Sequence, residues 1–505
     1  MPDAHPAAVV ILAAGEGTRM RSTTPKVLHE ICGRTLLGHV LAAAEPLKAD
    51  HTVVVVGSGR DRVADLLRRE APDAQPVVQA DQNGTGHAVR LAMQAIPDVA
   101  GTVLVLPGDA PLLTTELLAT LVEQHVGEED AATLLTAVLP DPTGYGRVIR
   151  DSSGAVTRVV EHRDAIPAEL DVTEVGTSVY AFEAALLRAA LDRIGTDNVQ
   201  SEEYLPDTIG LLVADGYAVG AVRAPDSRET EGVNDRVQLA AARRRLRDRL
   251  LEQWMRDGVT VVDPETTWID VGVRIERDAV VYPSTQLLGR TRVGSRAQVG
   301  PDCTLVDTAV GEGARVIRAH CEGADVGPDA NVGPYAYLRP GTLVGRGAKV
   351  GTFVEVKNSD LGEGAKVPHL TYVGDASIGE GTNIGASSVF VNYDGVTKHR
   401  SAIGAHARTG ADNMFVAPVS VGDGAYTAAG TVVIDDVPPG AMAVSRTPQR
   451  NIEGWVERRR PGTPAADAAA RARRAAEEGL PTSESAVTPG AGVDPVSPGQ
   501  EESSS

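Results

Sequence analysis

The second half of the chain repeats with a period of six residues, and this periodicity constrains the fold more than any other feature. An aliphatic residue followed by glycine recurs in steps of six from Val326-Gly327 to Val350-Gly351, and Leu338 stays in phase. Each six-residue unit predicts one short strand with an inward aliphatic, and three units close one triangular coil of a parallel β-helix. The aromatic content of 3% fits a core of stacked aliphatic side chains.

The repeat is not continuous. Its frame slips by one residue at Leu361-Gly362 and again at Ile378-Gly379, and residues 391–401 break the period altogether. We expect this segment to loop out of the coil. Because insertions in repeat proteins usually mark the binding face, the loop predicts a ligand site nearby.

The first half of the chain, up to Asn234, has a different pattern. Short apolar runs at Val9–Leu12, Val53–Val56 and Val103–Leu106 alternate with amphipathic stretches such as Leu112–Val122. Buried parallel strands have this appearance because helices cover both faces of their sheet. We therefore expect an α/β domain of the doubly wound, Rossmann-like class, with ligands bound beyond the carboxyl ends of its strands.

These patterns divide the chain into four regions. We expect the α/β domain over 1–235, a linker helix over 236–257, the β-helix over 258–456 and a disordered tail over 457–505, where Pro, Ala, Ser and acidic residues predominate. Several arginines are interspersed along the predicted linker helix. A nucleic-acid-binding helix is one interpretation, but the solvated face of a connecting helix fits better.

Overall charge and cysteine content exclude several classes of protein. With 48 basic and 68 acidic residues the net charge is −20, which argues against nucleic-acid binding and requires local cations for any phosphate-bearing substrate. Only three cysteines occur, without a CxxC spacing, so neither a disulfide framework nor a zinc site is expected. The apolar run at Val9–Leu12 is too short for a signal peptide or an integral membrane segment. We expect a soluble cytoplasmic protein.

A glycine-containing loop follows the first predicted strand. Gly15 and Gly17 would let backbone N–H groups approach phosphate oxygens, and Arg19 and Lys26 add cations. The loop is neither a Walker loop nor a dinucleotide fingerprint, because Met20 stands where the third glycine belongs. The simpler alternative is a tight turn from strand to helix.

Polar residues also cluster in the β-helix. Three full repeats separate Arg339 from Lys357, so they should stack one coil apart, and stacked cations favour an anion between them. His369 follows Glu355 by slightly less than one coil, where a carboxylate could orient the histidine as a general base. The alternatives are a solvated ladder of charges and a structural histidine.

The loop with Gly15, Gly17, Arg19 and Lys26 resembles the signature of sugar-nucleotide pyrophosphorylases, and further segments of that family follow in order. The resemblance implies that Asp109 and Asn234 bind Mg²⁺; a helix cap is the alternative for Asp109. It also implies that Arg19 and Lys26 are catalytic. The implied UTP and UDP-sugar contacts are Leu12, Ala13, Ala14, Gly15, Lys26, Gln79, Gly84, Thr85, Gly146, Glu161, Gly176 and Asn234.

With both halves considered, residues 8–456 resemble the family of bacterial bifunctional N-acetylglucosamine-1-phosphate uridylyltransferases and glucosamine-1-phosphate acetyltransferases. The resemblance implies a left-handed β-helix, a homotrimer, acetyl sites built between subunits, and acetyl-CoA, glucosamine 1-phosphate and UTP as small-molecule substrates. It makes His369 the acetyl-transfer base, with Glu355 orienting it. The implied contacts of the acetyl site are Arg339, Lys357, Tyr372, Asn383, Asn392, Tyr393, Lys398, Ala411, Ala429 and Arg446.

The chain departs from the family at several positions. Gly176 replaces an asparagine that contacts the sugar, Ala411 replaces a serine, and residues 201–207 read Ser-Glu-Glu-Tyr-Leu-Pro-Asp. Two rival interpretations remain. One is a glucose-1-phosphate nucleotidylyltransferase whose β-helix only oligomerises, and the other is a scaffold subunit with a degenerate transferase domain.

Overall fold

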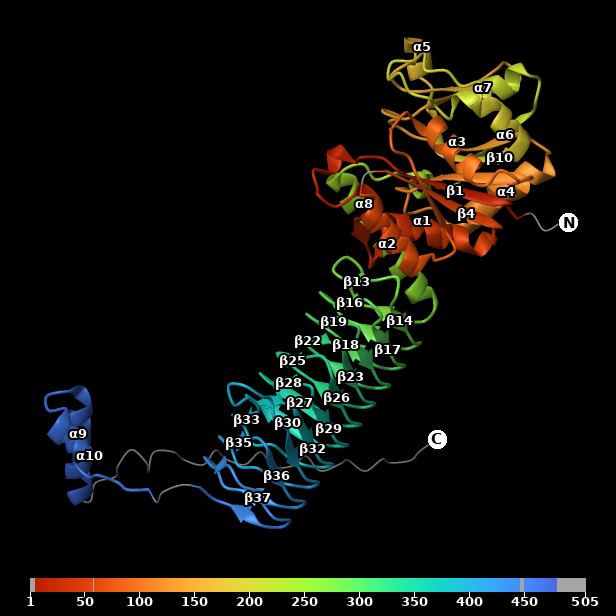
Figure 1. Ribbon diagram of the computed structural model, residues 1–505. Coiled ribbons are helices and arrows are strands. Elements are labelled where there is room, and N and C mark those ends of the chain that lie inside the picture. The colour runs from red at the N-terminus through yellow and green to blue at the C-terminus, as the bar shows by residue number, and fades with distance from the viewer. Residues whose placement is uncertain (1–4, 58, 446–448, 479–505) are drawn as a thin grey trace, which may run out of the picture. The chain divides into compact units, whose positions relative to one another are not determined.

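The computed structural model describes residues 5–57, 59–445 and 449–478. The chain forms two units that divide after Val444. Within the first unit, Figure 1 shows the α/β part in red to yellow and the stacked coils of the β-helix in green to blue.

The α/β part is built on one mixed sheet with the order β11-β7-β10-β6-β1-β4-β5. β1 pairs in parallel with β4 and β6, so the carboxyl ends of these strands meet at one edge. The strands are β1 (Ala8–Ala13), β4 (His51–Val56), β5 (Gln75–Val78), β6 (Thr102–Pro107), β7 (Ala132–Val138), β8 (Arg147–Arg150), β9 (Val156–Val160), β10 (Glu174–Glu183) and β11 (Val219–Arg223), with the hairpin β2 (Glu30–Ile31) and β3 (Arg34–Thr35) beside it.

Alternate residues of β1 pack into different cores. Val9 and Ile11 join a cluster with residues of α1, α2 and α4, whereas Ala8 and Val10 join a cluster with residues of α3, α6 and α7. This two-sided burial confirms the doubly wound arrangement. The helices are α1 (Leu36–Ala44), α2 (Arg60–Glu70), α3 (Thr85–Ala95), α4 (Thr115–Gly127), α5 (Pro167–Leu170), α6 (Ala184–Leu191) and α7 (Asp207–Ala214), with 3₁₀ turns η1 (Thr18–Met20), η2 (Lys26–Leu28), η3 (Glu45–Leu47) and η4 (Ser227–Thr230).

α8 (Arg236–Arg256) follows the sheet, and the carboxylate of Asp235 caps it by accepting hydrogen bonds from the backbone N–H groups of Val237 and Gln238. Leu239 and Leu246 of this helix pack with Met20 and Ile31. The arginine-rich sequence therefore forms a continuous helix with one face against the α/β part.

The β-helix consists of three parallel sheets whose strands come from successive coils. The first sheet contains β12 (Thr260–Val261), β15 (Val280–Val281), β18 (Gln298–Val299), β21 (Arg315–Val316), β24 (Asn331–Val332), β27 (Lys349–Thr352) and β30 (Lys366–His369). The second contains β13 (Trp268–Ile269), β16 (Gln286–Leu288), β19 (Thr304–Val306), β22 (Ala319–Glu322), β25 (Ala336–Leu338), β28 (Glu355–Lys357), β31 (Tyr372–Gly374), β33 (Val389–Val391), β35 (Met414–Val416) and β38 (Val432–Val433). The third contains β14 (Arg274–Ile275), β17 (Arg292–Val293), β20 (Ala309–Val310), β23 (Ala324–Val326), β26 (Thr342–Val344), β29 (Asp360–Leu361), β32 (Ala376–Ile378), β34 (Ser401–Ile403) and β36 (Val419–Val421), and a short pair, β37 (Tyr426–Thr427) and β39 (Met442–Ala443), follows.

The register of these sheets confirms the predicted parallel β-helix and its slips. Val332 pairs with Val350 and Leu338 with Val356, which is one coil of three full repeats. Val344, by contrast, pairs with Leu361, so this coil is shorter by the predicted slip. The segment between β33 and β34 loops out, as the break in the repeat predicts.

The second unit departs from the prediction of disorder over part of its length. α9 (Trp455–Arg459) and α10 (Pro464–Glu477) are helical, since Thr463 caps α10, Pro464 starts it and alanine favours its interior. An ion pair of 2.6 Å joins Arg473 to Glu457. The remainder of the predicted tail, 479–505, lies outside the described residues. In the part of the chain that the structure describes, no helix is both long and apolar enough to cross a membrane.

Candidate active sites

The loop after β1 is shaped by Gly17. Its φ of 63° is left-handed, and a Cβ there would lie 2.6 Å from the Cβ of Lys26. A side chain at this position would therefore displace Lys26. A Cβ on Gly15, by contrast, would have no atom within 4 Å, so the loop is open on that side.

Four predicted residues converge next to this loop. Lys26 forms an ion pair with Asp109, and its Nζ also donates to Asn234 Oδ1 at 3.2 Å. Arg19 Nη2 donates to the same oxygen at 3.1 Å. The backbone fixes the arrangement, because Val233 N donates to Asp109 O at 2.9 Å. Loops that follow β1, β6 and η4 thus bring two acceptor and two cationic side chains together.

This arrangement fits a divalent cation. The side-chain oxygens of Asp109 and Asn234 both face the ammonium of Lys26, so positive charge is already stabilised between them. One carboxylate and one amide oxygen suit Mg²⁺, which takes few protein ligands and fills its shell with phosphate and water. The described residues contain no group of three or more His, Cys, Asp or Glu side chains that could hold a metal ion.

A cavity of about 240 Å³ extends from these residues toward β8 to β10. Gly146, Glu161 and Gly176 line it together with Arg19, Asp109 and Asn234, so the predicted sugar residues and the predicted metal residues share one space. A Cβ on Gly176 would lie 3.8 Å from the hydroxyl of Tyr180. Position 176 therefore leaves room in the cavity without offering a donor.

Glu161 has an unusual environment in this cavity. Burial raises the pKa of its carboxyl group above the ordinary value, and the negative charges of Asp164, Asp207 and Glu202 add to the effect. Nearby, the buried Arg147 donates to the carbonyl oxygens of Pro142, at 2.8 Å, and Tyr145. Arg147 does not line the cavity but holds the loop that carries Tyr145 and Gly146.

The predicted base-binding segment lies beyond β5. Gln79 is buried, and its amide Nε2 donates to Gly84 O at 3.0 Å and lies 3.2 Å from His87 Nδ1. Thr85 Oγ1 accepts from Leu205 N at 3.0 Å. Gln82 Nε2 donates to Ala14 O at 2.9 Å, which ties this segment to the loop that begins with Ala14, directly after the predicted Leu12 and Ala13 at the end of β1.

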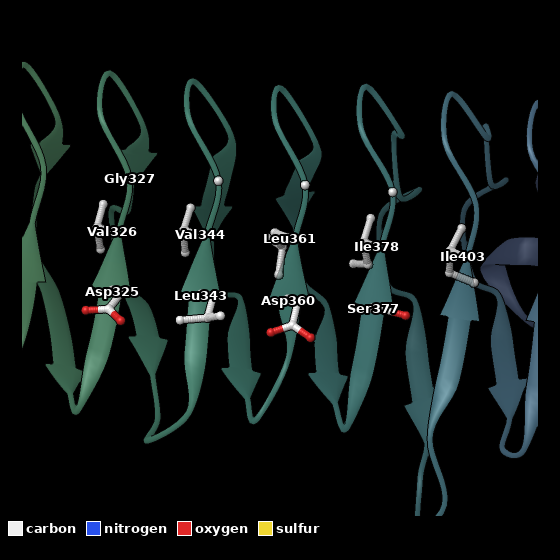
Figure 2. Close-up of a pocket in the computed structure, with 13 residues that line it drawn as sticks. Asp325, Val326, Gly327, Leu343, Val344, Asp360, Leu361, Ser377, Ile378 and Ile403 are labelled. Carbon is white, nitrogen blue, oxygen red and sulfur yellow. The ribbon is translucent and has the colours of Figure 1, made fainter.

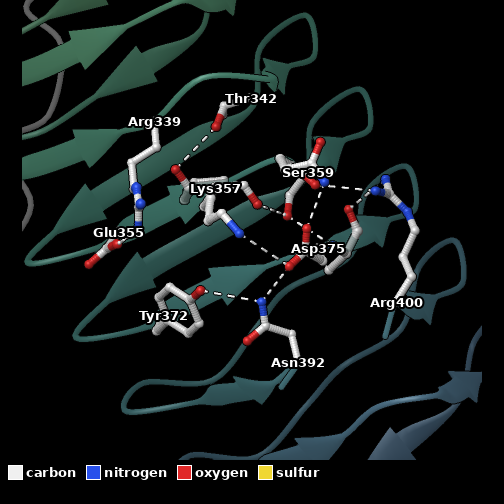
Figure 3. A network of polar contacts seen from close by, with 12 residues as sticks. Arg339, Thr342, Glu355, Lys357, Ser359, Tyr372, Asp375, Asn392 and Arg400 are labelled. Carbon is white, nitrogen blue, oxygen red and sulfur yellow. Dashed lines mark hydrogen bonds and ion pairs between the residues drawn. The ribbon is translucent and has the colours of Figure 1, made fainter. Parts of the chain in front are cut away.

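A second group of predicted residues meets on the β-helix (Figure 3). Arg339 Nη1 lies 3.0 Å from the carboxylate of Glu355, and Lys357 Nζ lies 3.4 Å from that of Asp375. The pairing of Leu338 with Val356 places Arg339 and Lys357 in adjacent register, as their spacing predicts. Each of the two cations has a carboxylate beside it.

A third cation joins them from the loop between β33 and β34. Contact with Lys357 and its positive charge lower the pKa of Lys398, and Arg339 contributes in the same direction. Asn392, from the same loop, is buried and donates to the hydroxyl of Tyr372 at 3.4 Å. Three like charges this close favour a bound anion.

Asp375 and its partner Asn358 are residues of this network that sequence reasoning missed. The carboxylate of Asp375 accepts hydrogen bonds from Asn358 Nδ2 at 2.6 Å and from Asn392 Nδ2. Burial by itself would raise the pKa of Asp375, but these hydrogen bonds and the charge of Lys357 outweigh burial and lower it. The carboxylate is therefore ionised at neutral pH.

The structure does not bring Glu355 to His369 within one chain. Glu355 pairs in register with Tyr372 and forms its ion pair with Arg339, whereas His369 ends β30 in a different sheet, opposite Thr352. Among the described residues the imidazole of His369 has no hydrogen-bond partner, and the side chain is exposed. The orienting role of Glu355 stays a prediction.

The remaining predicted residues lie on later coils or loops. The backbone of Asn383 forms isolated parallel β-bridges with Lys366 and with Arg408, and that of Tyr393 forms an antiparallel one with Lys398. Ala411 and Ala429 are exposed, and Gly430 N donates to Ala411 O at 2.9 Å. Arg446 lies outside the described residues.

An apolar groove of about 450 Å³ lies elsewhere, on the sheet of β23, β26, β29, β32 and β34 (Figure 2). Glycines of the repeat border it. A Cβ on Gly327 or Gly345 would lie 2.7 or 2.6 Å from a backbone oxygen of the next coil, so glycine is needed there for coil stacking. The groove contains none of the predicted site residues.

The chain is similar to known proteins over nearly its whole length. Residues 9–170 match the model of the MobA-like NTP transferase domain. The chain is 62% identical to the bifunctional protein GlmU of Thermobifida fusca, over 95% of the chain and 100% of that protein. It is 59% identical to the bifunctional protein GlmU of Streptomyces avermitilis, over 94% of the chain and 98% of that protein.

Proposed function

Because the chain belongs to the family of bifunctional GlmU proteins, enzymes that combine a uridylyltransferase with an acetyltransferase, we propose a division of labour between its two sites. The β-helix acetylates glucosamine 1-phosphate, and the α/β part then couples N-acetylglucosamine 1-phosphate to UTP. The product is UDP-N-acetylglucosamine, a precursor of bacterial cell-wall polymers.

In the acetyl site, Arg339, Lys357 and Lys398 would hold the phosphate of glucosamine 1-phosphate. His369 takes a proton from the amine as its nitrogen attacks the thioester carbonyl of acetyl-CoA. The new C–N bond forms, the C–S bond breaks and CoA leaves as the thiolate. No covalent enzyme intermediate is required.

In the uridylyl site, a phosphate oxygen of N-acetylglucosamine 1-phosphate attacks the α-phosphorus of UTP and pyrophosphate leaves. Arg19 and Lys26 would stabilise the charge that develops on the leaving group. Asp109 and Asn234 would hold Mg²⁺, which when bound supplies further charge neutralisation on the phosphates. Gln79 and Gly84 would contact the uracil, and Gly146 and Glu161 the sugar.

We further propose that the protein acts in the cytoplasm as a trimer assembled through the β-helix. Three buried free thiols, Cys32, Cys303 and Cys321, suit a reducing compartment. His369, Tyr393 and Lys398 of the acetyl site are exposed, which suits a site that a neighbouring subunit completes.

The arrangement of Arg19, Asp109 and Asn234 around one cavity, with Lys26 in contact with Asp109 and Asn234, carries this proposal. The test is incubation with glucosamine 1-phosphate, acetyl-CoA, UTP and Mg²⁺, with CoA and pyrophosphate measured separately. Both products should form, and pyrophosphate release should depend on prior acetylation. Pyrophosphate release from glucose 1-phosphate without CoA release would favour the glucose-1-phosphate nucleotidylyltransferase instead, and release of neither product would favour a scaffold subunit.

A further inference from the structure

Asp375 occupies a buried corner of the acetyl-site coil. It follows β31 with a φ of 50° and is 8% exposed. Its carboxylate accepts from the amides of Asn358 and Asn392 and lies 3.4 Å from Lys357 Nζ (Figure 3). Burying a carboxylate is costly unless such partners compensate it, so these contacts are mutually dependent.

Two of the three partners belong to the proposed substrate site. Lys357 is one of the phosphate-binding cations, and Asn392 also donates to the hydroxyl of Tyr372 at 3.4 Å. The adjacent Gly374 makes room for this contact, because a Cβ there would lie 2.4 Å from that hydroxyl and 2.7 Å from Asn392 Nδ2. Gly374 and Asp375 together form a platform beside three side chains, those of Lys357 in β28, Tyr372 in β31 and Asn392 in the loop between β33 and β34.

The platform also balances charge. Lys357 and Lys398 are close enough to affect each other, and Arg339 adds a third positive charge. Because Glu355 pairs with Arg339, Asp375 supplies the negative charge that pairs with Lys357, and this charge also acts on Lys398. Without it, like-charge repulsion would drive the lysine side chains apart before any substrate arrives.

We propose that Asp375 is a positioning residue for acetyl transfer, which fixes the ammonium of Lys357 and the amide of Asn392 in the geometry that the phosphate-bearing substrate requires. The inference rests on the proposed acetyltransferase function. Asp375 acts through these side chains and does not itself touch the reacting atoms.

The test is Asp375→Asn, which removes the charge and keeps the size of the side chain. Asparagine tolerates left-handed backbone, so the corner itself should persist. Since a ground-state contact is lost, we expect the KM for glucosamine 1-phosphate to rise about tenfold or more, with kcat for CoA release within about threefold of the parent. The KM for acetyl-CoA and the rate of pyrophosphate release from UTP and N-acetylglucosamine 1-phosphate should not change.

Asp329→Asn is the matched control. Asp329 also has a left-handed φ, 58°, at a corner of the β-helix, but its ion pair with Arg346, 3.3 Å long, is exposed. This variant should leave every constant unchanged. In a Lys357→Gln background the effect of Asp375→Asn should shrink, because the group through which it acts is gone.

The outcomes are distinguishable. A parent protein that releases no CoA would overturn the proposed function and this inference with it. An active parent with an unchanged KM in Asp375→Asn would overturn the inference alone. An effect of equal size with and without Lys357, or a loss of kcat that Asp329→Asn shares, would show that Asp375 serves only the stability of the coil.

Discussion

At position 411 a methyl group stands where the family resemblance leads us to expect a hydroxyl. A neutral hydrogen bond contributes about 0.5–1.5 kcal/mol, or about two- to tenfold in rate if it forms only in the transition state. Ala411→Ser should therefore raise the kcat of CoA release several-fold. Pyrophosphate release is the internal control and should stay constant; a kcat for CoA release that stays flat or falls would mean that another group already fills the role.

The partly buried position of Glu161 leads us to expect that the stability of the folded state depends on pH. Burial raises the pKa of its carboxyl group, so the folded state binds the proton more tightly than the unfolded chain. Below its pKa in the unfolded chain, Glu161 is protonated in both states and its burial carries no ionisation cost. As pH rises from there through the raised pKa of the folded state, the stability of the fold decreases. Glu161→Gln should raise the free energy of unfolding at pH 8, with a much smaller effect at pH 4.5, close to the ordinary pKa of a glutamate.

Thermal denaturation at the two pH values measures this difference. The same variant should raise the KM for the sugar phosphate, since a carboxylate that lines the cavity is lost. A variant that is less stable than the parent at pH 8 would contradict the assignment of burial as the dominant cause.

The structure brings many of the predicted residues of each site together, but sequence reasoning missed Asp375 for a physical reason. Aspartates recur in left-handed conformation at corners of the β-helix, as at Asp302, Asp307 and Asp329. In the sequence alone, Asp375 is indistinguishable from these turn residues. The role of Asp375 becomes visible only in the structure, where the loop between β33 and β34 brings Asn392 into contact with its carboxylate. The sequence did not reveal the ion-pair partner of Glu355 either. The spacing of the coils predicts which residues stack, but it does not predict which cation pairs with a given carboxylate.

Among the elements, the loop between β33 and β34 depends on Asp394. Its carboxylate accepts from the backbone N–H groups of Val396 and Thr397, at 2.8 and 2.6 Å, and lies 2.8 Å from His399 Nε2. The hydrogen bond from Thr397, followed by that from His399, lowers the pKa of Asp394 to about 2. The carboxylate is therefore ionised at neutral pH, and its contribution, present above the ordinary pKa of an aspartate, is lost progressively as pH falls from there through about 2.

We expect Asp394→Ala to loosen this loop, which carries Asn392, Tyr393 and Lys398. The KM for acetyl-site substrates should rise several-fold, and hydrogen exchange should accelerate over 391–401, while pyrophosphate release is unaffected. Asp394→Asn, which keeps an acceptor, should show a smaller change. Equal exchange rates in the parent and in Asp394→Ala would contradict the role of this side chain.

The elements themselves were predictable to different degrees. The period of six predicted the strands of the β-helix because every repeat places the same residue inward. The apolar runs of the α/β part predicted β1, β4 and β6, yet nothing in their composition reveals direction. β10 runs antiparallel to β6 and β7, and β8 and β9 form an antiparallel ribbon, because hydrophobic content reports burial and not chain direction.

For the molecule as a whole, two separate sites imply two separable activities. Asp109 lies in the cavity of the α/β part, and His369 lies on the β-helix. Asp109→Ala should abolish pyrophosphate release and leave CoA release nearly intact, and His369→Ala should do the reverse. Loss of both activities in a variant that retains its circular dichroism spectrum would contradict the two-site model.

The last prediction concerns the proposed trimer. Tyr335, Phe353 and Leu370 succeed one another at one corner of the β-helix, each more than half exposed, and the rings of Tyr335 and Phe353 stack at 5.3 Å. Such exposed apolar surface favours contact with another subunit. Phe353→Glu should give a smaller species in light scattering at micromolar concentration.

If acetyl sites form between subunits, the same substitution must also stop CoA release, because the exposed His369, beside Leu370, would lose the neighbouring chain. Pyrophosphate release should persist, since Arg19, Lys26, Asp109 and Asn234 all come from one chain. Val199→Glu, at an equally exposed apolar position of the α/β part, is the control and should change neither mass nor activity. A monomeric Phe353→Glu protein with full acetyltransferase activity would show instead that one chain contains the complete site.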